Sequence, residues 1–371
     1  MISVLVTGSD GLLGWHVRCF LSTLKEVKVI ACNRSQFNDA EYLAEAVKRS
    51  DAVVHLAGMN RGNEQEVAKT NVALADQLVA ACQATNAKPH VLYSSSTHAD
   101  GQSSYGVSKR TAHEHLEAWA HACGAAYCNL ILPHIFGEHG KPFYNSVVST
   151  FAYQLSQDLT PEIKSDGQLS LLHAQDVAAL IWKHIGLRTS GTERPLGTPI
   201  SVTALLERLQ GLIARYRNGV VPLLSQPLDL RLFNTFRSYC TPEQRAHSLK
   251  LHTDNRGALF ESIRSDGCGQ VFLSTTHPGI TRGNHFHTRK VERFVVIEGE
   301  AEIKMRRMLT AETHTYRVSG TAPQAIDIPT LHTHMIKNVG NSPLLTMFWA
   351  GEHFDPQDPD TYFCEVDEAV S

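Results

Sequence analysis

The chain has 371 residues, more than a single hydrophobic core usually supports, so two domains are expected. Its hydrophobic fraction of 42% and charged fraction of 19% fit a soluble globular protein. The formal net charge is −3 and no dense run of Lys and Arg occurs, so the basic face that nucleic-acid binding requires is not expected.

Cysteine usage and apolar runs indicate the compartment. The 8 cysteines are scattered and form no CxxC pair, which favours buried or free thiols over a disulfide framework. The first residues enter an apolar strand pattern without the charged start and cleavage site of a signal peptide. The longest apolar runs, such as residues 344–350, are too short to span a bilayer. We therefore expect a cytoplasmic protein that does not insert into membranes.

In the first half of the chain, short apolar strands alternate with longer helical patterns. Strands are expected at residues 2–6, 27–31, 52–56 and 91–94. Helices are expected between and after them, among others at residues 67–84, 105–122 and 202–215. Such alternation predicts an α/β domain of the Rossmann type, in which helices cover both faces of a parallel sheet.

The rhythm of the sequence changes after about residue 248. Apolar residues at 301, 303 and 305 alternate with polar neighbours, which is the period of a half-buried strand. Further strand candidates, with no helix pattern between them, lie at residues 258–263, 270–275, 294–297, 315–318, 326–328 and 344–349. This pattern predicts an all-β barrel or sandwich. We therefore place the two domains at residues 1–247 and 248–371.

A glycine-rich segment, TGSDGLLG at residues 7–14, connects the first expected strand to the first helix. Gly8, Gly11 and Gly14 permit a tight turn, a close approach of the backbone to a pyrophosphate, and close packing of the helix on the sheet. The N-terminus of the helix then faces the anion. This position in the chain favours a dinucleotide-binding loop, with a purely structural turn as the alternative.

The end of the second strand indicates which dinucleotide is bound. An NAD site usually places Asp or Glu there, to accept hydrogen bonds from the ribose hydroxyls. This chain reads Asn33-Arg34 and has no acidic residue before Asp39. Because Arg34 can pair with a 2′-phosphate, NADPH is expected rather than NADH. The alternative is that Arg34 is an ordinary surface-loop residue.

A serine run at residues 94–96 precedes Tyr105 and Lys109, which lie four residues apart on one face of an expected helix. The lysine ammonium favours the phenolate and so lowers the tyrosine pKa, which suits the phenol to protonate a carbonyl that receives hydride. A serine hydroxyl would orient that carbonyl. With the glycine loop and the HLAG strand end at residues 55–58, these motifs resemble the extended short-chain dehydrogenase/reductase family over roughly residues 1–245.

That resemblance implies roles for individual residues. Tyr105 is then the proton donor, Lys109 its partner and Ser96 the third catalytic residue, with Ser95 or Thr97 as alternatives to Ser96. The residues implied to contact the cofactor are Gly8, Gly11, Gly14, Asn33, Arg34, Leu56, Ala57, Gly58, Tyr105 and Lys109. The resemblance also implies that Asn145 contacts a nucleotide-sugar.

The segment GNHFHTRKVERF carries two histidines two residues apart on an expected strand, so both rings point to one face. His285, His287, Glu292 and His334 supply three imidazoles and one carboxylate, which suit Zn²⁺ and also Fe²⁺, Mn²⁺ or Ni²⁺. Packed core histidines without a metal are the alternative. The spacing is similar to that of the cupin family over about residues 250–371, which implies a jelly-roll barrel, although Leu331 stands where the second cupin motif has glycine.

The whole chain resembles the CapF family of bifunctional capsular polysaccharide enzymes, which includes WbjC and FnlB. The segments that carry this match are HLAGMNR, SSYGVSK, KPFYNSV, PGITRGNHFH and FDPQDPDTYFCEV. The resemblance implies two steps toward UDP-N-acetyl-L-fucosamine. The cupin epimerises C3 of a UDP-2-acetamido-2,6-dideoxy-4-hexulose, and the reductase domain then reduces C4 with NADPH to UDP-2-acetamido-2,6-dideoxy-β-L-talose. It also implies a homodimer or a higher homo-oligomer.

The chemistry explains why both activities would share one chain. A C4 ketone acidifies the proton on C3, and a metal or cation near the ketone oxygen stabilises the enolate. Reduction removes the ketone, so the new stereocentre can no longer epimerise. His332 and Lys304 are the candidates for the epimerase base.

Two departures from the family pattern bear on the substrate, and two alternative functions stay open. The family reads R-x-P-N before Phe-Gly, where this chain has Ile131 and His134, so contacts with the sugar nucleotide are expected to differ. One alternative is a 4-ketosugar reductase whose cupin only stabilises or dimerises the chain. The other is a sugar-nucleotide-binding protein without catalytic activity.

Overall fold

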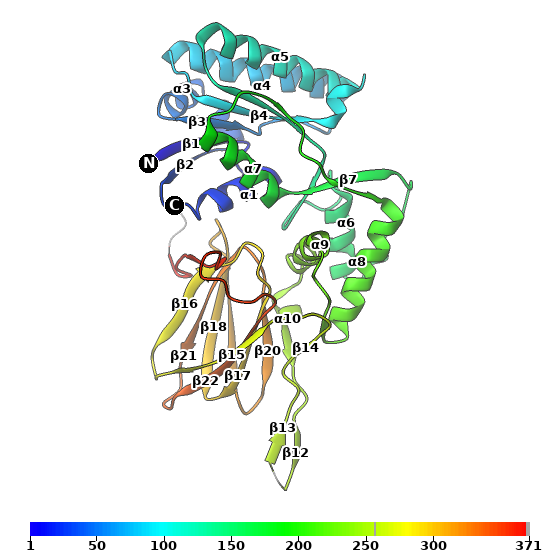
Figure 1. Cartoon of the computed structure of the whole chain (residues 1–371), viewed down its shortest axis with the longest axis vertical. Coiled ribbons are helices and arrows are strands. Elements are labelled where there is room, and N and C mark those ends of the chain that lie inside the picture. Colours follow the sequence, from blue (N-terminus) through cyan, green and yellow to red (C-terminus); the bar gives the residue numbers. More distant parts are fainter. Residues whose placement is uncertain (256, 369–371) are drawn as a thin grey trace. The chain divides into compact units, whose positions relative to one another are not determined.

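The computed structural model describes residues 1–255 and 257–368, which form two compact units. Unit 1 comprises residues 1–146 and 167–201, and unit 2 comprises the described residues of 147–166 and 202–371. Figure 1 gives the elements of each unit. The domain boundary expected at residue 247 stays a prediction. In the structure, residues 147–166 and 202–247 group with the C-terminal strands. Within the described ranges, no helix is long and apolar enough to cross a membrane.

Unit 1 is built on a six-stranded sheet in which every neighbouring pair is parallel. Its strands, in spatial order, are β2 (Val27–Cys32), β1 (Ile2–Thr7), β3 (Ala52–His55), β4 (His90–Ser96), β5 (Tyr127–Leu132) and β8 (Gly191–Glu193). The strand order reverses between β1 and β3, and such a reversal opens a crevice at the carboxyl ends of the strands. The prediction of a Rossmann-type parallel sheet is confirmed.

Helices cover both faces of this sheet because successive strand residues point to opposite sides. In β1, Leu5 packs in one apolar core while Val4 and Val6 pack in the other. The first core contains residues of α3 (Ala40–Lys48), α4 (Glu64–Thr85) and α5 (Ser104–Cys123), and the second contains residues of α1 (Leu12–Leu21) and α7 (Ala174–Leu187). Figure 1 shows α4 and α5 side by side along one face of the sheet.

Three shorter strands and two short helices complete unit 1. They are β6 (His134–Phe136), β7 (Gln168–His173), β9 (Thr198–Ser201), α2 (Arg34–Phe37) and η1 (Thr97–Asp100). Side-chain caps set the helix starts, as where Asn63 accepts hydrogen bonds from the backbone amides of Gln65 and Glu66 at the start of α4.

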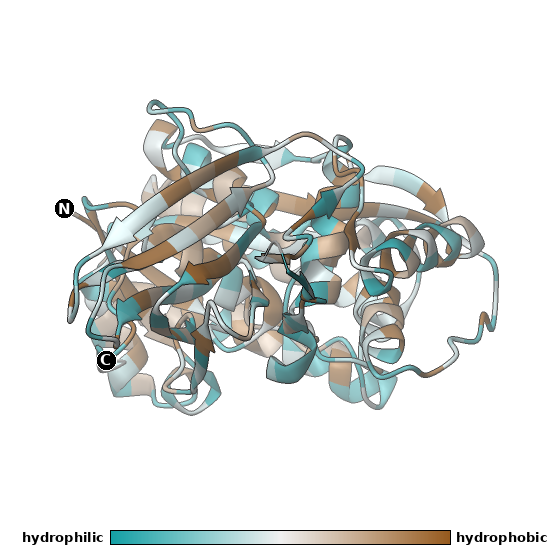
Figure 2. Ribbon diagram, turned by 90° about the horizontal axis from the view of Figure 1, so that it is seen from below, coloured by the Kyte–Doolittle hydropathy of each residue, from teal (hydrophilic) through white to brown (hydrophobic). Residues whose placement is uncertain are grey.

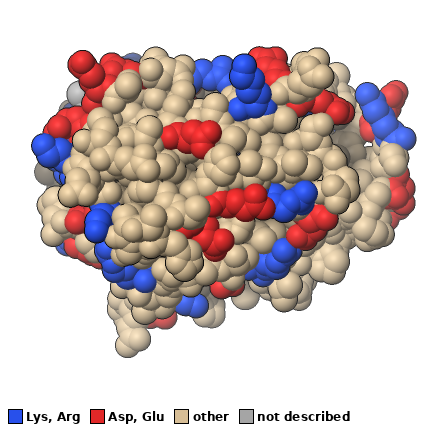
Figure 3. Space-filling model, turned by 90° about the horizontal axis from the view of Figure 1, so that it is seen from above, with Lys and Arg blue, Asp and Glu red and all other residues tan. Residues whose placement is uncertain are grey.

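On the molecular face displayed in Figure 3, acidic and basic side chains lie interspersed rather than gathered by sign.

Unit 2 contains a barrel of two five-stranded antiparallel sheets, which confirms the all-β prediction for the C-terminal region. The first sheet is β11 (Ala246–Ser248), β20 (Gln324–Ile328), β17 (Glu292–Glu298), β22 (Leu344–Ala350) and β15 (Gln270–Thr276). The second is β19 (Thr313–Ser319), β18 (Glu300–Arg307), β21 (His332–Asn338), β16 (Thr281–Phe286) and β23 (Tyr362–Phe363). Both sheets contribute apolar side chains, such as Phe294 and Ile303, to one buried core. Figure 2 shows apolar and polar residues alternating along the strands.

The helices of unit 2 are α6 (Val147–Ser156), α8 (Val202–Arg217), α9 (Pro227–Arg237) and α10 (Pro242–Arg245). The first three pack on one another, and α10 lies beside β11 and β20 of the barrel. Two short strand pairs, β12 (His252–Asp254) with β13 (Gly257–Leu259) and β10 (Val220–Val221) with β14 (Arg264–Ser265), complete the unit. Helix α9 also bonds to the barrel, because the Arg237 guanidinium donates to the carbonyl of Ile328 at 2.6 Å.

Candidate active sites

The glycine loop lies at the carboxyl end of β1, at the crevice of the parallel sheet. Gly8 has a φ of +65°, and a Cβ added there would lie 2.8 Å from the backbone nitrogen of Ala57. A Cβ at Gly14 would lie 2.3 Å from the carbonyl oxygen of Gly8. Gly11 is the N-cap of α1 and provides no side-chain cap, so the first amides of that helix stay available to an anion.

A cavity of about 410 Å³ opens beside this loop. Five residues predicted to contact the cofactor line it: Gly8, Asn33, Arg34, Ala57 and Gly58. The sequence reasoning missed six further lining residues: Phe37, Asn38, Met59, Glu66, Thr70 and Leu74. The last three recur every four residues on α4, and this helical spacing was the signal that could have found them.

The other five predicted cofactor residues are not among the described residues that line the cavity: Tyr105 and Lys109, which are described below, and Gly11, Gly14 and Leu56. Gly11 and Gly14 shape the loop, as described above, and do not appear among the described residues that line the cavity. The backbone amide of Leu56 donates to the Thr7 hydroxyl, and its side chain packs against the core beside α1 and α7. The roles of these three residues in cofactor binding remain predictions.

The structure brings Ser96, Tyr105 and Lys109 together at the end of β4 and the start of α5. Lys109 is buried, and its ammonium donates to the carbonyl of Ser94 at 2.8 Å and lies 6.0 Å from the centre of the Tyr105 ring. Burial lowers the pKa of Lys109 to about 8. Of the three candidate hydroxyls, that of Ser96 is the one that lowers the pKa of the Tyr105 phenol, which favours it over the alternatives Ser95 and Thr97 as the third residue.

The expected lowering of the tyrosine pKa is wrong for this arrangement. Burial raises the pKa of Tyr105 above its usual value, and the hydrogen bond from Ser96 offsets this only in part. The phenol is therefore held in its protonated form, which is the form that donates a proton.

The remaining predicted residues of unit 1 are Asn145 and the two departures from the family pattern, Ile131 and His134. The Asn145 side-chain oxygen accepts from the Arg61 guanidinium at 3.0 Å, and Arg61 also donates to the carbonyl of Phe143. Of the two departures from the family pattern, Ile131 is buried in β5, and the His134 ring lies 3.3 Å from the Ser146 hydroxyl. These residues therefore already have protein partners or core positions.

The four predicted metal ligands converge inside the barrel. One donor atom from each of His285, His287, Glu292 and His334 lies within 4.8 Å of the others. His287 Nε2 is 2.8 Å from a Glu292 carboxylate oxygen, and His334 Nε2 is 3.6 Å from the same oxygen. A backbone bulge between Gly283 and His285 interrupts the pairing of β16 with β21, and bulges of this kind re-aim side chains.

The electrostatics of this cluster suit a divalent cation. Burial first, and then the neighbouring His334, lower the pKa of His285 to about 3, so that ring is neutral and can ligate. Burial also lowers the pKa of His334, whose Nε2 is a buried nitrogen without a hydrogen-bond partner. Burial opposes ionisation of Glu292, but His287 outweighs it, and the pKa of the carboxyl lies well below its usual range. Three imidazole nitrogens and one carboxylate thus fit Zn²⁺.

A cavity of about 460 Å³ adjoins the metal-ligand cluster. His285, His287 and Glu292 line it, together with the cationic side chains of Arg282 and Lys290. Its apolar walls include Phe272, Phe294 and Phe348.

The two residues named as candidate epimerase bases do not appear among the described residues that line this cavity. The Lys304 ammonium pairs with Asp367, and the His332 ring contacts the carbonyl of Thr330.

Leu331, which replaces the expected glycine, adopts a left-handed backbone with a φ of 56°. Its amide donates to the carbonyl of His287 at 2.7 Å, and its side chain is fully buried. The turn that glycine would usually make therefore forms with leucine, because burial and the hydrogen bond offset the strain.

Comparisons with known proteins agree with this architecture. Residues 4–193 match the NAD dependent epimerase/dehydratase family, and residues 252–362 match the polysaccharide biosynthesis C-terminal domain. A Pseudomonas aeruginosa protein described as UDP-2-acetamido-2,6-beta-L-arabino-hexul-4-ose reductase is 32% identical over 100% of both chains.

Solved structures are also similar to this chain. The capsular polysaccharide assembling protein CapF from Staphylococcus aureus is similar with a TM-score of 0.64 and 30% identity, over 98% of this chain and 100% of that one. The UDP-N-acetylglucosamine 4-epimerase from Bacillus cereus is 22% identical over 58% of this chain and 82% of its own, with a TM-score of 0.52, and shows the fold alone. The chain therefore belongs to the NAD dependent epimerase/dehydratase family, and within it to the CapF-like proteins that carry a polysaccharide biosynthesis C-terminal domain.

Proposed function

We propose that the chain is a bifunctional UDP-sugar enzyme of polysaccharide biosynthesis. The barrel epimerises C3 of a UDP-2-acetamido-2,6-dideoxy-4-hexulose, and unit 1 then reduces C4 with NADPH to UDP-2-acetamido-2,6-dideoxy-β-L-talose. The observation that carries this proposal is the presence, in one chain, of a Ser-Tyr-Lys group and a separate cluster of three histidines and one glutamate. The names of the full-length relatives, a 4-ketosugar reductase and a capsular polysaccharide protein, support it.

In the reduction, bound NADPH supplies the hydride that C4 receives. Tyr105 then donates its phenolic proton to the C4 oxygen, and its raised pKa keeps that proton in place until the oxygen becomes basic. Ser96 orients the ketone, and the Lys109 ammonium stabilises the phenolate that forms.

The residues that line the cavity beside the glycine loop support NADPH rather than NADH as the cofactor. Arg34 lines the cavity at the start of α2 and can pair with a 2′-phosphate. Asp39 is the nearest acidic residue after the second strand, and its carboxylate already accepts hydrogen bonds from the amides of Glu41 and Tyr42 at the start of α3. The end of β2 thus carries no carboxylate that could accept hydrogen bonds from the ribose hydroxyls of NADH.

In the epimerisation, the C3–H bond breaks, its proton goes to a base, and its electron pair delocalises into the C4 carbonyl as an enolate. A proton then returns to C3 from the opposite face. His285, His287, Glu292 and His334 would hold a divalent ion such as Zn²⁺, which supplies positive charge to stabilise the enolate oxygen. The cavity also presents the ammonium of Lys290, a second source of positive charge beside the same cluster.

Deuterium exchange at C3 tests the proposal and separates it from its rivals. The protein is incubated in D₂O with the UDP-4-keto-2-acetamido-2,6-dideoxyhexose, without NADPH, and the C3 signal is followed by NMR. The proposal expects exchange that a chelator abolishes and Zn²⁺ restores. Absent exchange with continued NADPH oxidation would leave a ketoreductase with a structural barrel, and NADPH binding without oxidation of any UDP-4-ketosugar would leave a binding protein.

A homodimer or higher homo-oligomer forms part of the same proposal. Light scattering of the purified full-length chain measures its mass in solution. A monomeric mass at the concentrations used in the assays would contradict the proposed oligomer but would leave the two proposed reactions unaffected.

A further inference from the structure

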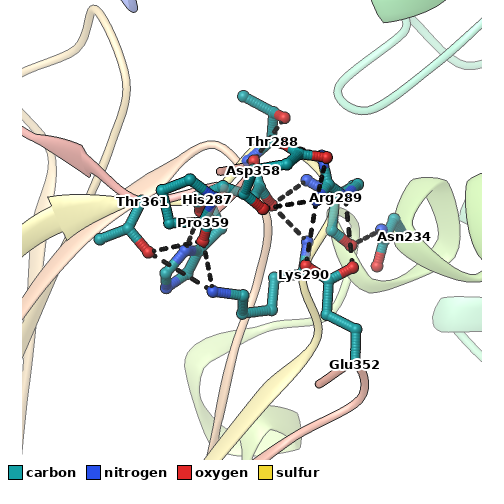
Figure 4. A network of polar contacts seen from close by, with 10 residues as sticks. Asn234, His287, Thr288, Arg289, Lys290, Glu352, Asp358, Pro359 and Thr361 are labelled. Carbon is teal, nitrogen blue, oxygen red and sulfur yellow. Dashed lines mark hydrogen bonds and ion pairs between the residues drawn. The ribbon is translucent and has the colours of Figure 1, made fainter. Parts of the chain in front are cut away.

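Asp360 lies at the centre of a network beside the metal-ligand cluster. It follows the last long strand of the barrel, is fully buried, and has a φ of 41°. Figure 4 shows how the turn of Thr288, Arg289 and Lys290 gathers around the segment from Asp358 to Thr361. A buried carboxylate is costly unless hydrogen bonds satisfy it, so the partners of Asp360 indicate what it holds in place.

The carboxylate of Asp360 accepts four hydrogen bonds from the turn that follows His287. One oxygen accepts from the Thr288 amide at 2.9 Å and from the Thr288 hydroxyl at 2.7 Å. The other accepts from the amides of Arg289 at 3.0 Å and Lys290 at 2.8 Å. Successive backbone amides around a carboxylate form a rigid anion nest, so this turn has one favoured shape.

The backbone carbonyl of Asp360 acts on the metal-ligand cluster itself. His287 Nδ1 lies 2.5 Å from that carbonyl oxygen, so Nδ1 carries the proton and donates it. Nε2 is then the nitrogen left to face Glu292, 2.8 Å from its carboxylate, and it is the atom that would ligate a cation. Bonds of this kind set the ring orientation and the tautomer of metal-binding histidines.

The same turn places Lys290 at the cavity. Its ammonium donates to the carbonyl of Pro359 at 2.7 Å and to the Thr361 hydroxyl at 3.4 Å (Figure 4). Outside the nest, the Arg289 guanidinium bonds to Glu352 at 3.2 Å and to Asp358 at 3.1 Å.

We propose that Asp360 is a positioning residue for the metal centre and acts through two groups, its backbone carbonyl and its side-chain carboxylate. Its carbonyl orients His287, and its carboxylate fixes the turn that joins His287 to Lys290 and Glu292. The proposal rests on the metal centre of the proposed function, and it assigns the C-terminal segment a part in cation affinity. Because Asp360 is neither one of the four predicted ligands nor among the described residues that line the cavity, its effect passes through His287.

Zinc affinity measures this effect without reference to turnover. The metal-free full-length protein competes with a chromophoric chelator for Zn²⁺, as wild type, Asp360→Asn and Asp358→Asn. Asparagine tolerates a left-handed backbone but replaces one acceptor oxygen with a donor that faces the amides. Asp360→Asn is expected to weaken Zn²⁺ binding roughly 10–100-fold, the usual cost of losing an outer partner of a metal ligand. Asp358, whose side chain is 62% exposed, should change affinity at most about fivefold.

The outcomes separate the inference from the proposed function. A wild-type chain that binds no Zn²⁺ refutes the metal centre and this inference together. If wild type binds Zn²⁺ and folded Asp360→Asn binds it equally well, the inference alone is wrong, even if the variant melts at a lower temperature. Should Asp360→Asn fail to fold, Thr288→Val removes a single bond of the nest, and unchanged affinity in that variant overturns the inference.

Discussion

The buried ion pair of unit 1 allows a stability prediction with a defined pH dependence. Glu138 is fully buried, and its carboxylate lies 2.9 Å from His173 Nε2 and 3.8 Å from His16 Nε2. His16 Nδ1 lies 2.9 Å from the Gln175 amide nitrogen, and His16 Nε2 lies 3.1 Å from the carbonyl oxygen of Glu138. This cluster joins α1, which begins at the glycine loop, to the start of α7.

Glu138→Gln removes the charge while keeping the size of the side chain. Removing one partner of a buried ion pair lowers the free energy of unfolding by about 3–5 kcal/mol. Because glutamine can still form hydrogen bonds, we expect a loss of about 3 kcal/mol. For a unit of this size that corresponds to a melting temperature lower by roughly 6–12 °C. Glu114→Gln, at an exposed position of α5, is the control and should change the free energy of unfolding by at most about 0.5 kcal/mol.

The pH dependence follows from the pKa of Glu138. Burial alone would raise it, but His173 and His16 outweigh burial, and the pKa lies well below its usual range. A depressed folded pKa contributes stability above the unfolded value near pH 4.5, and this stability is lost as the pH falls below it. Thermal unfolding of wild type and Glu138→Gln, followed by circular dichroism, should therefore show a constant gap from pH 7 to pH 5 that narrows toward pH 3. A gap that stays constant across this range would refute the electrostatic reasoning.

Three functional predictions accompany it. Tyr105→Phe should abolish NADPH oxidation while C3 exchange in D₂O continues, because the phenol acts only in the reduction; loss of both activities in the folded variant would contradict two separate sites. His285→Ala should abolish exchange and weaken Zn²⁺ binding but leave NADPH affinity unchanged, as fluorescence titration would measure. Arg34→Ala should weaken NADPH binding by about 1–2 kcal/mol, or roughly 5–30-fold, with little change for NADH, in line with the loss of a charge-assisted pair; equal losses for both cofactors would count against a 2′-phosphate contact.

Much of the fold could be predicted because the relevant signals are local. Strand–helix alternation identified the parallel sheet of unit 1, and two-residue alternation identified the strands of the barrel. The sequence reasoning missed the helices α6 and α9. Residues 147–156 and 227–237 each bury one apolar face, so the helical pattern was present in the sequence, and both helices pack against α8 within unit 2.

The candidate sites were predictable in composition but only partly in detail. The spacing of His285, His287 and Glu292 pointed to one cluster, because residues on one strand face or in adjoining strands stay close. Which hydroxyl of residues 94–97 serves Tyr105 was open until contact with the phenol favoured Ser96. The direction of the Tyr105 pKa also could not be predicted, since burial depends on side chains distant in the chain.

By itself, the sequence determined the two kinds of sheet, the glycine loop and the set of residues that could ligate a cation or protonate a ketone. These features depend on residue type and on spacings of a few positions, which local backbone geometry translates directly into structure. Only the tertiary structure decided that Asp360 holds His287, 73 positions away, and that Glu138 joins His16 to His173. Such partners meet because strands and helices from distant parts of the chain pack together, and no short-range pattern records which buried carboxylate or carbonyl will face which ring.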